Sequence, residues 1–467
     1  MRILTKEILN FEGKEVELAG WVQVRRDHGK LIFIDLRDRS GIAQVVFNPK
    51  NNPDLHKVSD TLRPEWVIRL WGKVQKRPKG MENSKIPTGL HEITATKLEV
   101  LAEAKTPPFD VTSNGTDIGE DVRMQYRYLD LRRPRMQKNL RMRAKVIKFF
   151  RDYLTAKDFV EIETPILSKS TPEGARDYVV PSRLHSGKFY ALPQSPQQYK
   201  QLLMVAGMER YFQITRCFRD EDTRGDRQPE FTQLDLEMSF VNEEEILNLI
   251  EELYTNIVKT LYPEKKIQKT PFPRISYKEA MEKWQSDKPD LRKDKNNPDE
   301  LAFTFIVDFP MFEWKERELR WDAVHHPFTM PKVKDVDDFR AQFKKDPSKI
   351  MAHQYDFVLN GYEIGGGSIR IHDPKLLEAV FEAMGNDPKD IRAKFGHMLE
   401  AFEYGVPPHG GIAPGIDRFL MILQNEPNIR EVIAFPKTGD GRDLMMDAPS
   451  EITKEQLKEL HIKIEKK

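Results

Sequence analysis

The sequence contains a single cysteine, Cys217, among its 467 residues. One thiol excludes an intramolecular disulfide, and it cannot supply the usual ligand set of a structural zinc site. Cysteine usage this low is typical of a reducing compartment. We therefore expect a cytoplasmic protein that carries neither disulfides nor zinc.

Long apolar runs are also missing from the sequence. No stretch approaches the roughly 20 apolar residues that span a bilayer, and residues 1–11 mix charged with apolar side chains, unlike a signal peptide. We expect no membrane association. The formal net charge is only +1, so the overall charge does not indicate a nucleic-acid partner.

Residues 1–103 alternate apolar and polar positions in five short runs, which is typical of strands with one buried face. The runs are Val16–Val22, Leu31–Leu36, Ile42–Phe47, Val67–Val74 and His91–Leu98, with a predicted helix at Asn52–Leu62 after the third. This order of elements matches an OB-fold barrel. A generic small β-barrel fits the pattern alone equally well.

Residues 104–121 form a polar segment with prolines and glycines, which predicts a linker to a second domain at 122–467. In that domain, predicted helices at Asn139–Leu154, Gln197–Met204, Glu243–Leu261 and Ile416–Gln424 are interleaved with strand-like runs, including Phe159–Leu167. Asn360-Gly361 predicts a hairpin turn within Tyr355–Ile371. We predict a loop at Gly405–Gly415 and a charged helix at Lys454–Lys467. Without regular βαβ spacing, this favours an α+β fold on a mostly antiparallel sheet.

Three clusters carry residues suited to phosphate chemistry. In the first, Arg216–Phe231, two predicted strands flank a charged loop that presents Arg219 and Glu221. An arginine can bind phosphate oxygens in a fork, where lysine is only a point charge. The alternative for such a loop alone is a salt-bridged surface hairpin.

The second cluster pairs Asp356 with Glu363, followed by the glycines 365–367. Carboxylates on neighbouring strands can share Mg²⁺, and glycines permit close approach of the backbone to a ligand. No Gly-Lys-Ser/Thr follows, so a P-loop is not indicated. A mobile glycine bend is the alternative.

The third cluster, Gly410–Arg418, places Arg418 just inside a helix that follows a glycine-rich segment. Amides at a helix N-terminus together with an arginine suit a phosphate chain. Helix capping would explain the glycines, though not the arginine as easily.

Together the clusters resemble the three motifs of the class II aminoacyl-tRNA synthetases, in the right order. Phe159–Pro165 resembles motif 1, whose proline lies at a dimer interface, Arg219–Phe231 resembles motif 2, and Gly411–Arg418 resembles motif 3. Five further segments resemble the bacterial-type aspartate enzymes over almost the whole chain: Tyr126–Arg132, Thr171–Asp177, Gln194–Gln197, His325–Thr329 and Ile433–Lys437.

The resemblance implies a site for L-aspartate. It places the α-amino group at Glu173 and Asp235, near Ser195 and Gln197, and the side-chain carboxylate at Lys200 and Arg370, under a loop that carries His325 and His326. Arg219 contributes to the same site. Two cations suit a dicarboxylic substrate, whereas asparagine would leave this positive pair uncompensated.

The resemblance also implies ATP and Mg²⁺. It assigns Arg219 to the α-phosphate and Arg418 to the γ-phosphate, and Mg²⁺ to Asp356 and Glu363. Glu221, Gln228 and Phe231 would hold adenosine, and Asp220, Glu363, Gly415, Ile416 and Asp417 complete the expected ATP site. Charge neutralisation by Arg219, Arg418 and Glu363 with its cation, rather than a protein nucleophile, would carry catalysis.

In the barrel, the resemblance implies anticodon recognition by Arg25, Arg26, Lys30, Phe33, Gln44 and Glu92. The partners would be tRNA(Asp) and a second copy in a homodimer. His28 resembles the residue of enzymes that also charge tRNA(Asn), whose product passes to an amidotransferase. This one residue does not decide whether tRNA(Asn) is charged.

The chain departs from the bacterial-type pattern between motif 2 and the histidine loop. A domain-sized insertion is expected there, but only a short connector near residues 292–302 joins Ser286–Arg292 to Phe305–Pro310. We expect activity to survive with fewer contacts to the tRNA acceptor arm. An asparagine–tRNA ligase and a non-catalytic tRNA-binding paralogue are the rival interpretations.

Overall fold

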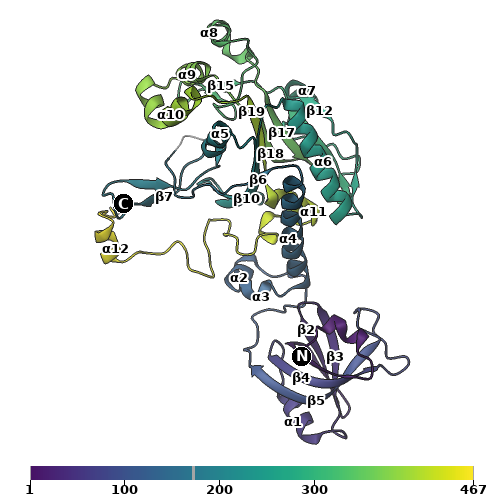
Figure 1. Cartoon of the computed structure of the whole chain (residues 1–467). Coiled ribbons are helices and arrows are strands. Elements are labelled where there is room, and N and C mark those ends of the chain that lie inside the picture. Colours follow the sequence, from purple (N-terminus) through teal and green to yellow (C-terminus); the bar gives the residue numbers. More distant parts are fainter. Residues whose placement is uncertain (1, 171–173, 466–467) are drawn as a thin grey trace. The chain divides into compact units, whose positions relative to one another are not determined.

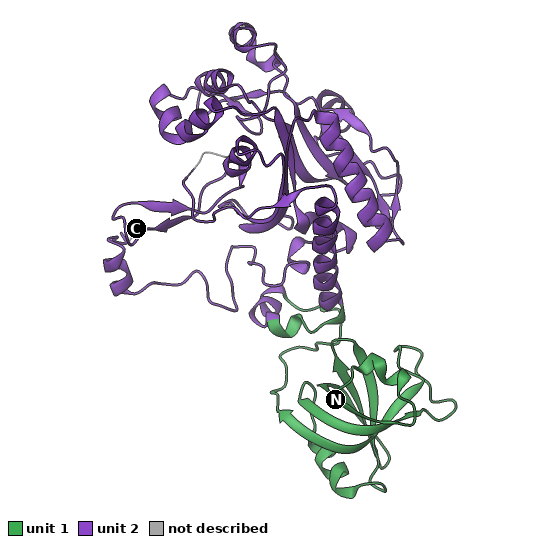
Figure 2. Cartoon of the chain, viewed as in Figure 1, with its two compact units in different colours: residues 1–119, 128–134 green, residues 120–127, 135–467 purple. Residues whose placement is uncertain are grey.

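The computed structural model describes residues 2–170 and 174–465 (Figure 1). The chain divides into two compact units (Figure 2). Unit 1 comprises residues 1–119 and 128–134, and unit 2 comprises residues 120–127 and 135–467.

Unit 1 is built on a closed five-stranded barrel in the order β1-β2-β3-β5-β4. Its strands are β1 Glu15–His28, β2 Leu31–Asp38, β3 Gly41–Phe47, β4 Val67–Lys76 and β5 His91–Ala102, with η1 Thr5–Asn10 before them and α1 Pro53–Thr61 after β3. Alternate residues such as Leu18, Ile34 and Leu70 point inward and are fully buried. The five predicted strands, the helix after the third strand and the OB-fold are therefore confirmed.

Unit 2 is built on an eight-stranded sheet in the order β12-β14-β17-β18-β19-β10-β9-β6. The strands are β12 Arg274–Ser276, β14 Phe303–Val307, β17 Gln354–Leu359, β18 Tyr362–Ile369, β19 His409–Pro414, β10 Glu230–Ser239, β9 Arg210–Phe218 and β6 Val160–Glu161. Only the β12–β14 and β6–β9 pairs of this sheet are parallel. The predicted α+β fold on a mostly antiparallel sheet is confirmed.

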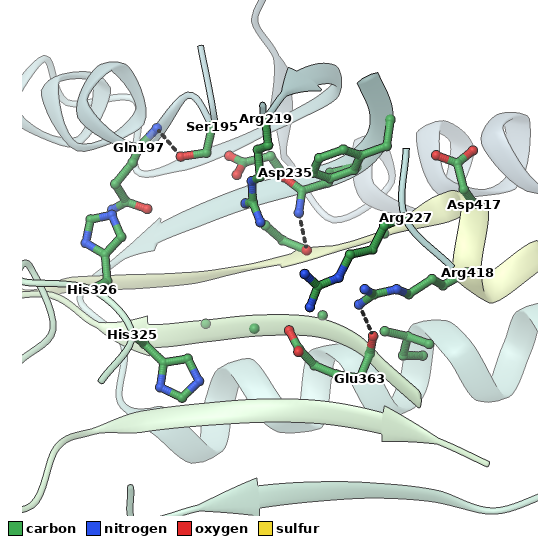
Figure 3. A pocket seen from close by; sticks show the side chains of 18 of the residues that line it. Ser195, Gln197, Arg219, Arg227, Asp235, His325, His326, Glu363, Asp417 and Arg418 are labelled. Carbon is green, nitrogen blue, oxygen red and sulfur yellow. Dashed lines mark hydrogen bonds between the residues drawn. The ribbon is translucent and has the colours of Figure 1, made fainter. Parts of the chain in front are cut away.

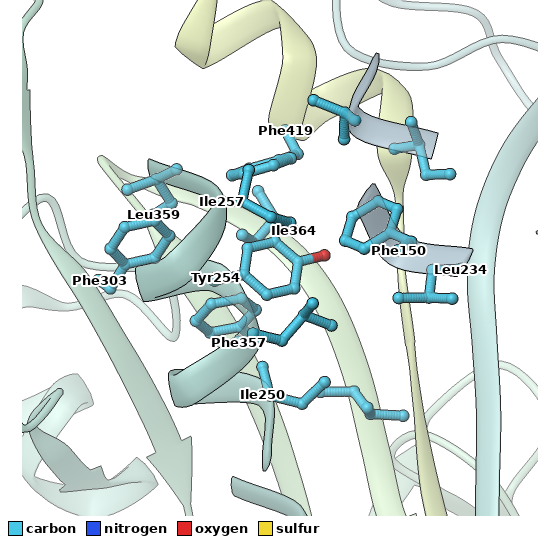
Figure 4. Packing of buried hydrophobic residues seen from close by; sticks show 14 of the residues in the cluster. Phe150, Leu234, Ile250, Tyr254, Ile257, Phe303, Phe357, Leu359, Ile364 and Phe419 are labelled. Carbon is cyan, nitrogen blue, oxygen red and sulfur yellow. The ribbon is translucent and has the colours of Figure 1, made fainter. Parts of the chain in front are cut away.

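Three helices cover one face of this sheet, α4 Pro134–Thr155, α6 Glu243–Leu261 and α11 Ile416–Leu423. Tyr254 of α6 lies at the centre of the core beneath them, with ring centroids 4.9 Å from Phe357 and 4.7 Å from Phe419 (Figure 4). The sheet's inward residues alternate with residues on the opposite face, as strand geometry requires. That opposite face carries the pocket described below.

The remaining elements of unit 2 surround the sheet. A second apolar core joins β15 Phe312–Lys315, α8 Val336–Lys345, α9 Pro374–Ala383 and α10 Pro388–Glu403, with α5 Gln197–Val205 and β16 Arg320–Ala323 beside it. The others are α2 Glu120–Gln125, β7 Val179–Pro181, β8 Phe189–Ala191, β11 Lys266–Ile267, α7 Tyr277–Trp284, β13 Glu300–Leu301, η2 Pro347–Lys349, η3 Ile429–Glu431 and α12 Lys454–Glu459. Helix α3 Arg127–Asp130 belongs to unit 1 except for its first residue. Within the described residues, no helix has the length and apolarity needed to cross a membrane.

Three predicted elements differ from the structure. Gly405–Gly415 is not a loop, because residues 409–414 form β19 within the large sheet. Its glycines reflect packing: a Cβ on Gly411 would lie 2.1 Å from the carbonyl oxygen of Leu236 on the neighbouring strand. The predicted strand Phe159–Leu167 is reduced to β6, and the predicted tail helix to α12.

Candidate active site

A pocket of about 350 Å³ opens on the face of the sheet away from α4, α6 and α11. Its walls come from α5, β10, β17, β18, β19, the loop between β9 and β10, and the start of α11. Fifteen of the predicted residues line it: Ser195, Gln197, Lys200, Arg219, Glu221, Gln228, Phe231, Asp235, His325, His326, Glu363, Arg370, Gly415, Asp417 and Arg418. Figure 3 shows most of their side chains converging from both sides of the pocket.

Three predicted residues within the described ranges do not line the pocket. Asp220 forms an exposed ion pair with Arg176 at 3.4 Å. Ile416 is fully buried in the core, and Asp356 lies just behind the pocket wall with 2% of its surface exposed. Glu173 lies outside the described residues.

Strand alternation in β10 explains why acids lie at one end of the pocket. Leu234 and Leu236 pack in the helix-covered core, so the alternate residues Gln233, Asp235 and Glu237 lie on the opposite face. Sequence reasoning missed Glu237. Its signal was available, because Glu237 lies two positions after Asp235 in the same predicted strand.

Four buried charged side chains form one network there. Lys200 Nζ lies 2.9 Å from Asp235 Oδ2 and 3.2 Å from Glu237 Oε2, and Arg370 Nε donates to Glu237 Oε1 at 2.8 Å. In the pocket by itself, Lys200 and Arg370 are therefore compensated by Asp235 and Glu237. Each cation already has an acidic neighbour.

The pKa values of the two acids in this network are shifted in opposite directions. Burial opposes the charge of Glu237, but Arg370 and Lys200 outweigh it and hold its pKa at about 2. Burial raises the pKa of Asp235, despite Lys200. Oδ1 of Asp235 is buried and has no hydrogen-bond partner among the described residues. Asp235 can therefore accept a further donor, and a cationic one would stabilise its charged form.

Arginines dominate the other end of the pocket. The Arg219 guanidinium lies over the Phe231 ring, 5.1 Å from its centroid. Arg418 donates to the carbonyl oxygen of Glu363 at 2.8 Å and pairs with Asp226 at 3.2 Å. Arg227, which sequence reasoning missed, lies beside Arg418 with its guanidinium toward Glu363 (Figure 3).

Asp417 connects the start of α11 to two other elements. Its Oδ2 accepts a hydrogen bond from the backbone N–H of Thr232 at 2.8 Å, and its Oδ1 pairs with Arg143 of α4. The carboxylate lines the pocket but is already engaged by these donors. Asp417 therefore positions α11 and its Arg418 relative to β10.

A pair of carboxylates lies beneath the arginines. Burial raises the pKa of Glu363, and repulsion from Asp356 adds to this effect. His325 Nε2 lies 3.3 Å from Asp356 Oδ2. Burial opposes the charge on His325, but Asp356 and Glu363 raise its pKa to about 9.

The three glycines of β18 have different structural reasons. A Cβ on Gly365 would lie 2.8 Å from Cα of Pro414, and one on Gly367 would lie 2.3 Å from the carbonyl oxygen of Gly411. Both are therefore required by close packing against β19. Only the middle one, Gly366, faces the polar side chains of the pocket.

His326 lines the pocket together with Lys200, Asp235 and Arg370. Its Nδ1 accepts from the backbone N–H of Phe328 at 3.3 Å, and its Nε2 is buried without a partner among the described residues. Burial, together with Arg370 and Lys200, lowers its pKa well below the usual value. His326 is therefore neutral, with Nε2 available as a donor.

The predicted anticodon residues lie in unit 1. Arg25 pairs with Asp60, Arg26 pairs with Asp35, and the His28 and Phe33 rings meet edge to face at 6.4 Å between centroids. Gln44 Nε2 donates to Glu92 at 3.0 Å. These residues lie on β1, β2, β3 and β5, except Asp60, which lies on α1.

Comparison with known proteins gives two family matches. Residues 119–439 match the model described as tRNA synthetases class II (D, K and N), and residues 16–101 match that described as an OB-fold nucleic acid binding domain. The first match alone covers more than half of the chain.

Curated relatives match along nearly the whole chain. An aspartate–tRNA(Asp/Asn) ligase of Rubrobacter xylanophilus is 44% identical, covering 97% of this chain and 95% of the relative. One from Dehalococcoides mccartyi is 43% identical, covering 97% of each.

Solved structures share the fold at lower identity. The asparaginyl-tRNA synthetase of Pyrococcus horikoshii, complexed with asparaginyl-adenylate, superposes with a TM-score of 0.74 at 24% identity, covering 94% of this chain and 98% of that chain. The aspartyl tRNA synthetase of Entamoeba histolytica gives 0.72 at 24% identity, covering 93% and 91%.

Proposed function

The chain belongs to the class II tRNA synthetases of the D, K and N group, and we propose that it is an ATP-dependent aspartate–tRNA ligase. It activates L-aspartate to aspartyl-adenylate and transfers the aspartyl group to the 3′ end of tRNA. The observation that carries this proposal is the buried network of Lys200, Asp235, Glu237 and Arg370 at the end of a pocket whose other end is rich in arginine. Relatives named aspartate–tRNA(Asp/Asn) ligases support it.

Aspartate fits the network by exchange of partners. Its α-ammonium group binds Asp235, whose Oδ1 has no partner among the described residues, and so replaces Lys200 as the counter-charge. Lys200 and Arg370 then hold the side-chain carboxylate, with Ser195, Gln197 and neutral His326 around the substrate. We also assign Glu173 and His325 to aspartate binding. Asparagine has no charge to place between two buried cations, which disfavours it.

ATP fits the arginine-rich end. We assign the α-phosphate to Arg219 and the γ-phosphate to Arg418 and Arg227, and we assign adenine to the ring of Phe231 beside Glu221 and Gln228. Gly415 and Asp417, which line the pocket, complete the proposed ATP site. The aspartate α-carboxylate attacks the α-phosphorus in line, a P–O bond forms, and pyrophosphate leaves. Fixed cations stabilise the charge that develops, so no protein nucleophile is needed.

The carboxylates fit a magnesium ion. Asp356 and Glu363 provide hard oxygen ligands next to the phosphate end of the pocket, and their mutual repulsion would be relieved by a cation. When bound, Mg²⁺ would neutralise phosphate charge. The chain's own contribution would be to hold an oxygen of each carboxylate at the space above Gly366.

We propose residues 1–103 as the anticodon-binding domain, 104–121 as the linker and 122–467 as the catalytic domain. The OB-fold supports nucleic-acid binding, and Phe33 is assigned to stacking against an unpaired base. Arg25, Arg26, Lys30, Gln44 and Glu92 are assigned to anticodon contacts.

We further propose that the usual insertion near residues 292–302 is absent. The alignment with the Dehalococcoides relative spans 586 positions, more than the 467 residues of this chain, so that relative carries residues which this chain lacks. The active-site residues lie outside the connector. Fewer contacts to the tRNA acceptor arm are the expected consequence.

We propose that tRNA(Asn) is charged as well as tRNA(Asp). The edge-to-face contact of His28 with Phe33 places the histidine beside the assigned base-stacking ring. Replacing His28 with Leu should weaken charging of tRNA(Asn) at least several-fold and leave tRNA(Asp) charging unchanged. Equal loss on both tRNAs would contradict this role. The mischarged product, aspartyl-tRNA(Asn), would then have to pass to an amidotransferase. We propose that the ligase acts in the cytoplasm.

A homodimer is part of the same proposal. The segment Phe159–Pro165 resembles motif 1, and the hairpin of β7 and β8 exposes Val179, Leu184 and Phe189 at 57%, 73% and 49%. Monomeric proteins rarely expose contiguous apolar surface of this kind. We propose that a second copy of the chain covers the exposed apolar side chains of this hairpin.

The experiment for the proposed function is amino-acid-dependent ATP–pyrophosphate exchange. We expect exchange with aspartate and Mg²⁺, and at least 100-fold less with asparagine. A preference for asparagine would identify an asparagine–tRNA ligase instead. Absence of exchange with both would identify a non-catalytic paralogue, although Arg219, Glu363 and Arg418 all line the pocket.

A further inference from the structure

Gln354 lies in the pocket wall, and neither the sequence motifs nor the proposed reaction uses it. It is 5% exposed and precedes Asp356 by two residues on β17. Tyr355 and Phe357 pack in the core, so Gln354 and Asp356 lie together on the pocket face of the strand. Gln354 lines the pocket, whereas Asp356, on the same face, is not part of the lining.

The side-chain amide of Gln354 is bonded to that carboxylate. Nε2 of Gln354 donates to Oδ1 of Asp356 at 3.1 Å, and His325 Nε2 approaches the other oxygen, Oδ2, at 3.3 Å. Both oxygens of Asp356 are therefore engaged from different sides. A carboxylate held in this way cannot rotate freely about its Cβ–Cγ bond.

Three polar atoms converge above Gly366. The position that a Cβ of Gly366 would take is 3.2 Å from Asp356 Oδ1, 3.7 Å from Gln354 Nε2 and 3.8 Å from Glu363 Oε1. Because glycine has no side chain, this space is open to the pocket. Asp356 and Glu363 thus face one space, and the amide of Gln354 borders it.

The described residues contain no group of three His, Cys, Asp or Glu side chains that could hold a metal ion. Two carboxylates alone suit Mg²⁺, which usually takes one or two carboxylates plus phosphate oxygens and water. Such a sparse ligand set depends on the groups that orient the ligands. Loss of an orienting partner typically costs 10- to 100-fold in metal affinity.

We propose that Gln354 is a positioning residue of the divalent-cation site, which holds Asp356 so that Oδ1 faces Glu363 across Gly366. This inference rests on the proposed ATP and Mg²⁺ site. Gln354 does not transfer a proton or contact the reacting atoms. Its effect on the reaction passes through Asp356.

The test replaces Gln354 with Met, which keeps the length of the side chain and removes the donor. Cation affinity is measured without turnover, by titrating Mn²⁺ into enzyme with a non-hydrolysable ATP analogue and following free Mn²⁺ by electron paramagnetic resonance. We expect about 10-fold weaker Mn²⁺ binding, a matching rise in the Mg²⁺ concentration for half-maximal pyrophosphate exchange, and an unchanged KM for aspartate.

A matched control comes from α8, where Gln342 Nε2 donates to Asp338 Oδ2 at 3.0 Å. Gln342→Met should leave Mn²⁺ binding unchanged, and the melting temperature of both variants reports folding. Gln354→Glu should also weaken Mn²⁺ binding. It replaces the amide N–H that donates to Asp356 with a carboxylate oxygen, which cannot donate to it.

Unchanged Mn²⁺ affinity in a folded Gln354→Met variant would overturn the proposal. Tighter Mn²⁺ binding in Gln354→Glu would also overturn it, since residue 354 would then act as a direct ligand. If the unaltered enzyme bound the analogue and Mn²⁺ but exchanged no pyrophosphate, the proposed function would fail while the role of Gln354 could still be measured.

Discussion

At the scale of single residues, burial and neighbouring charges set the protonation of this site. Glu237 stays ionised because Arg370 and Lys200 outweigh the cost of burying it. His409, which is fully buried behind the same network, stays neutral: burial lowers its pKa to about 4, and Glu237 only partly opposes this. The charge distribution that we propose for aspartate binding thus depends on side chains outside the pocket as well as inside it.

His409 makes stability depend on pH. Its pKa is about 4 in the folded chain and 6.5 without the fold. The unfolded state therefore takes up the proton first as pH falls, and folding loses stability between pH 6.5 and 4. The loss reaches about 2 kcal/mol at pH 5.

The variant His409→Gln should remove this part of the pH dependence. Melting temperatures at pH 7.5 and pH 5.0 are the measurement. We expect the variant to be less stable at pH 7.5, because Nδ1 of His409 bonds to the carbonyl oxygen of Pro407 at 2.8 Å, and to lose less than the unaltered chain on acidification. An equal loss in both proteins would contradict the buried neutral histidine.

Residue types and spacing predicted most of the pocket lining, because motif resemblance fixes which side chains accompany each other. Glu237 and Gln354 were missed. The spacing of Glu237 from Asp235 already placed both acids on one strand face, but the role of Gln354 depends on what lies opposite its strand, as Gly366 lies opposite Asp356. That information comes from strand pairing, which a sequence does not specify residue by residue.

At the scale of elements, the site depends on how α11 is held against β10 and α4. Asp417, at the first turn of α11, bonds to Thr232 of β10 and to Arg143 of α4. Its side chain is 4% exposed. Arg418 follows Asp417 directly. Any shift in the contacts of Asp417 would therefore also shift Arg418, which we assign to the γ-phosphate.

Replacing Arg143 with Met should therefore weaken both stability and ATP binding. Removing one partner of a buried ion pair leaves an uncompensated charge, which costs about 3 kcal/mol. We expect a lower melting temperature and a KM for ATP raised several-fold more than the KM for aspartate. Lys145→Met, an exposed position on the same helix, is the control. Unchanged ATP binding would show that the joint is not needed to place Arg418.

Elements were predicted where one physical signal dominated. Helix α6 follows a clear amphipathic pattern and begins with a capping box at Asn242 and Glu245, and the Asn360-Gly361 turn adopts the positive φ angles that a tight hairpin requires. Strand β19 was mistaken for a loop because its glycines are needed by neighbouring strands rather than by a turn.

At the scale of the whole molecule, the exposed hairpin of β7 and β8 makes assembly testable. Val179→Glu places a charge on the proposed dimer surface and should convert a species of twice the 54.6 kDa chain mass into a monomer. Light scattering after size-exclusion chromatography is the measurement. Leu319→Glu, at a position 73% exposed beside β16, should leave the mass unchanged. If the chain without substitutions had the mass of a monomer, the proposed homodimer would be contradicted.

The most direct test of the account is charging of purified tRNA(Asp) and tRNA(Asn) with labelled aspartate, ATP and Mg²⁺. This test involves both units, because we assign adenylation to the pocket of unit 2 and propose that the barrel of unit 1 selects the tRNA. We predict that both tRNAs are aspartylated and that labelled asparagine is attached to neither. Charging of either tRNA with asparagine, or failure to aspartylate tRNA(Asp), would contradict the assignment as an aspartate–tRNA ligase.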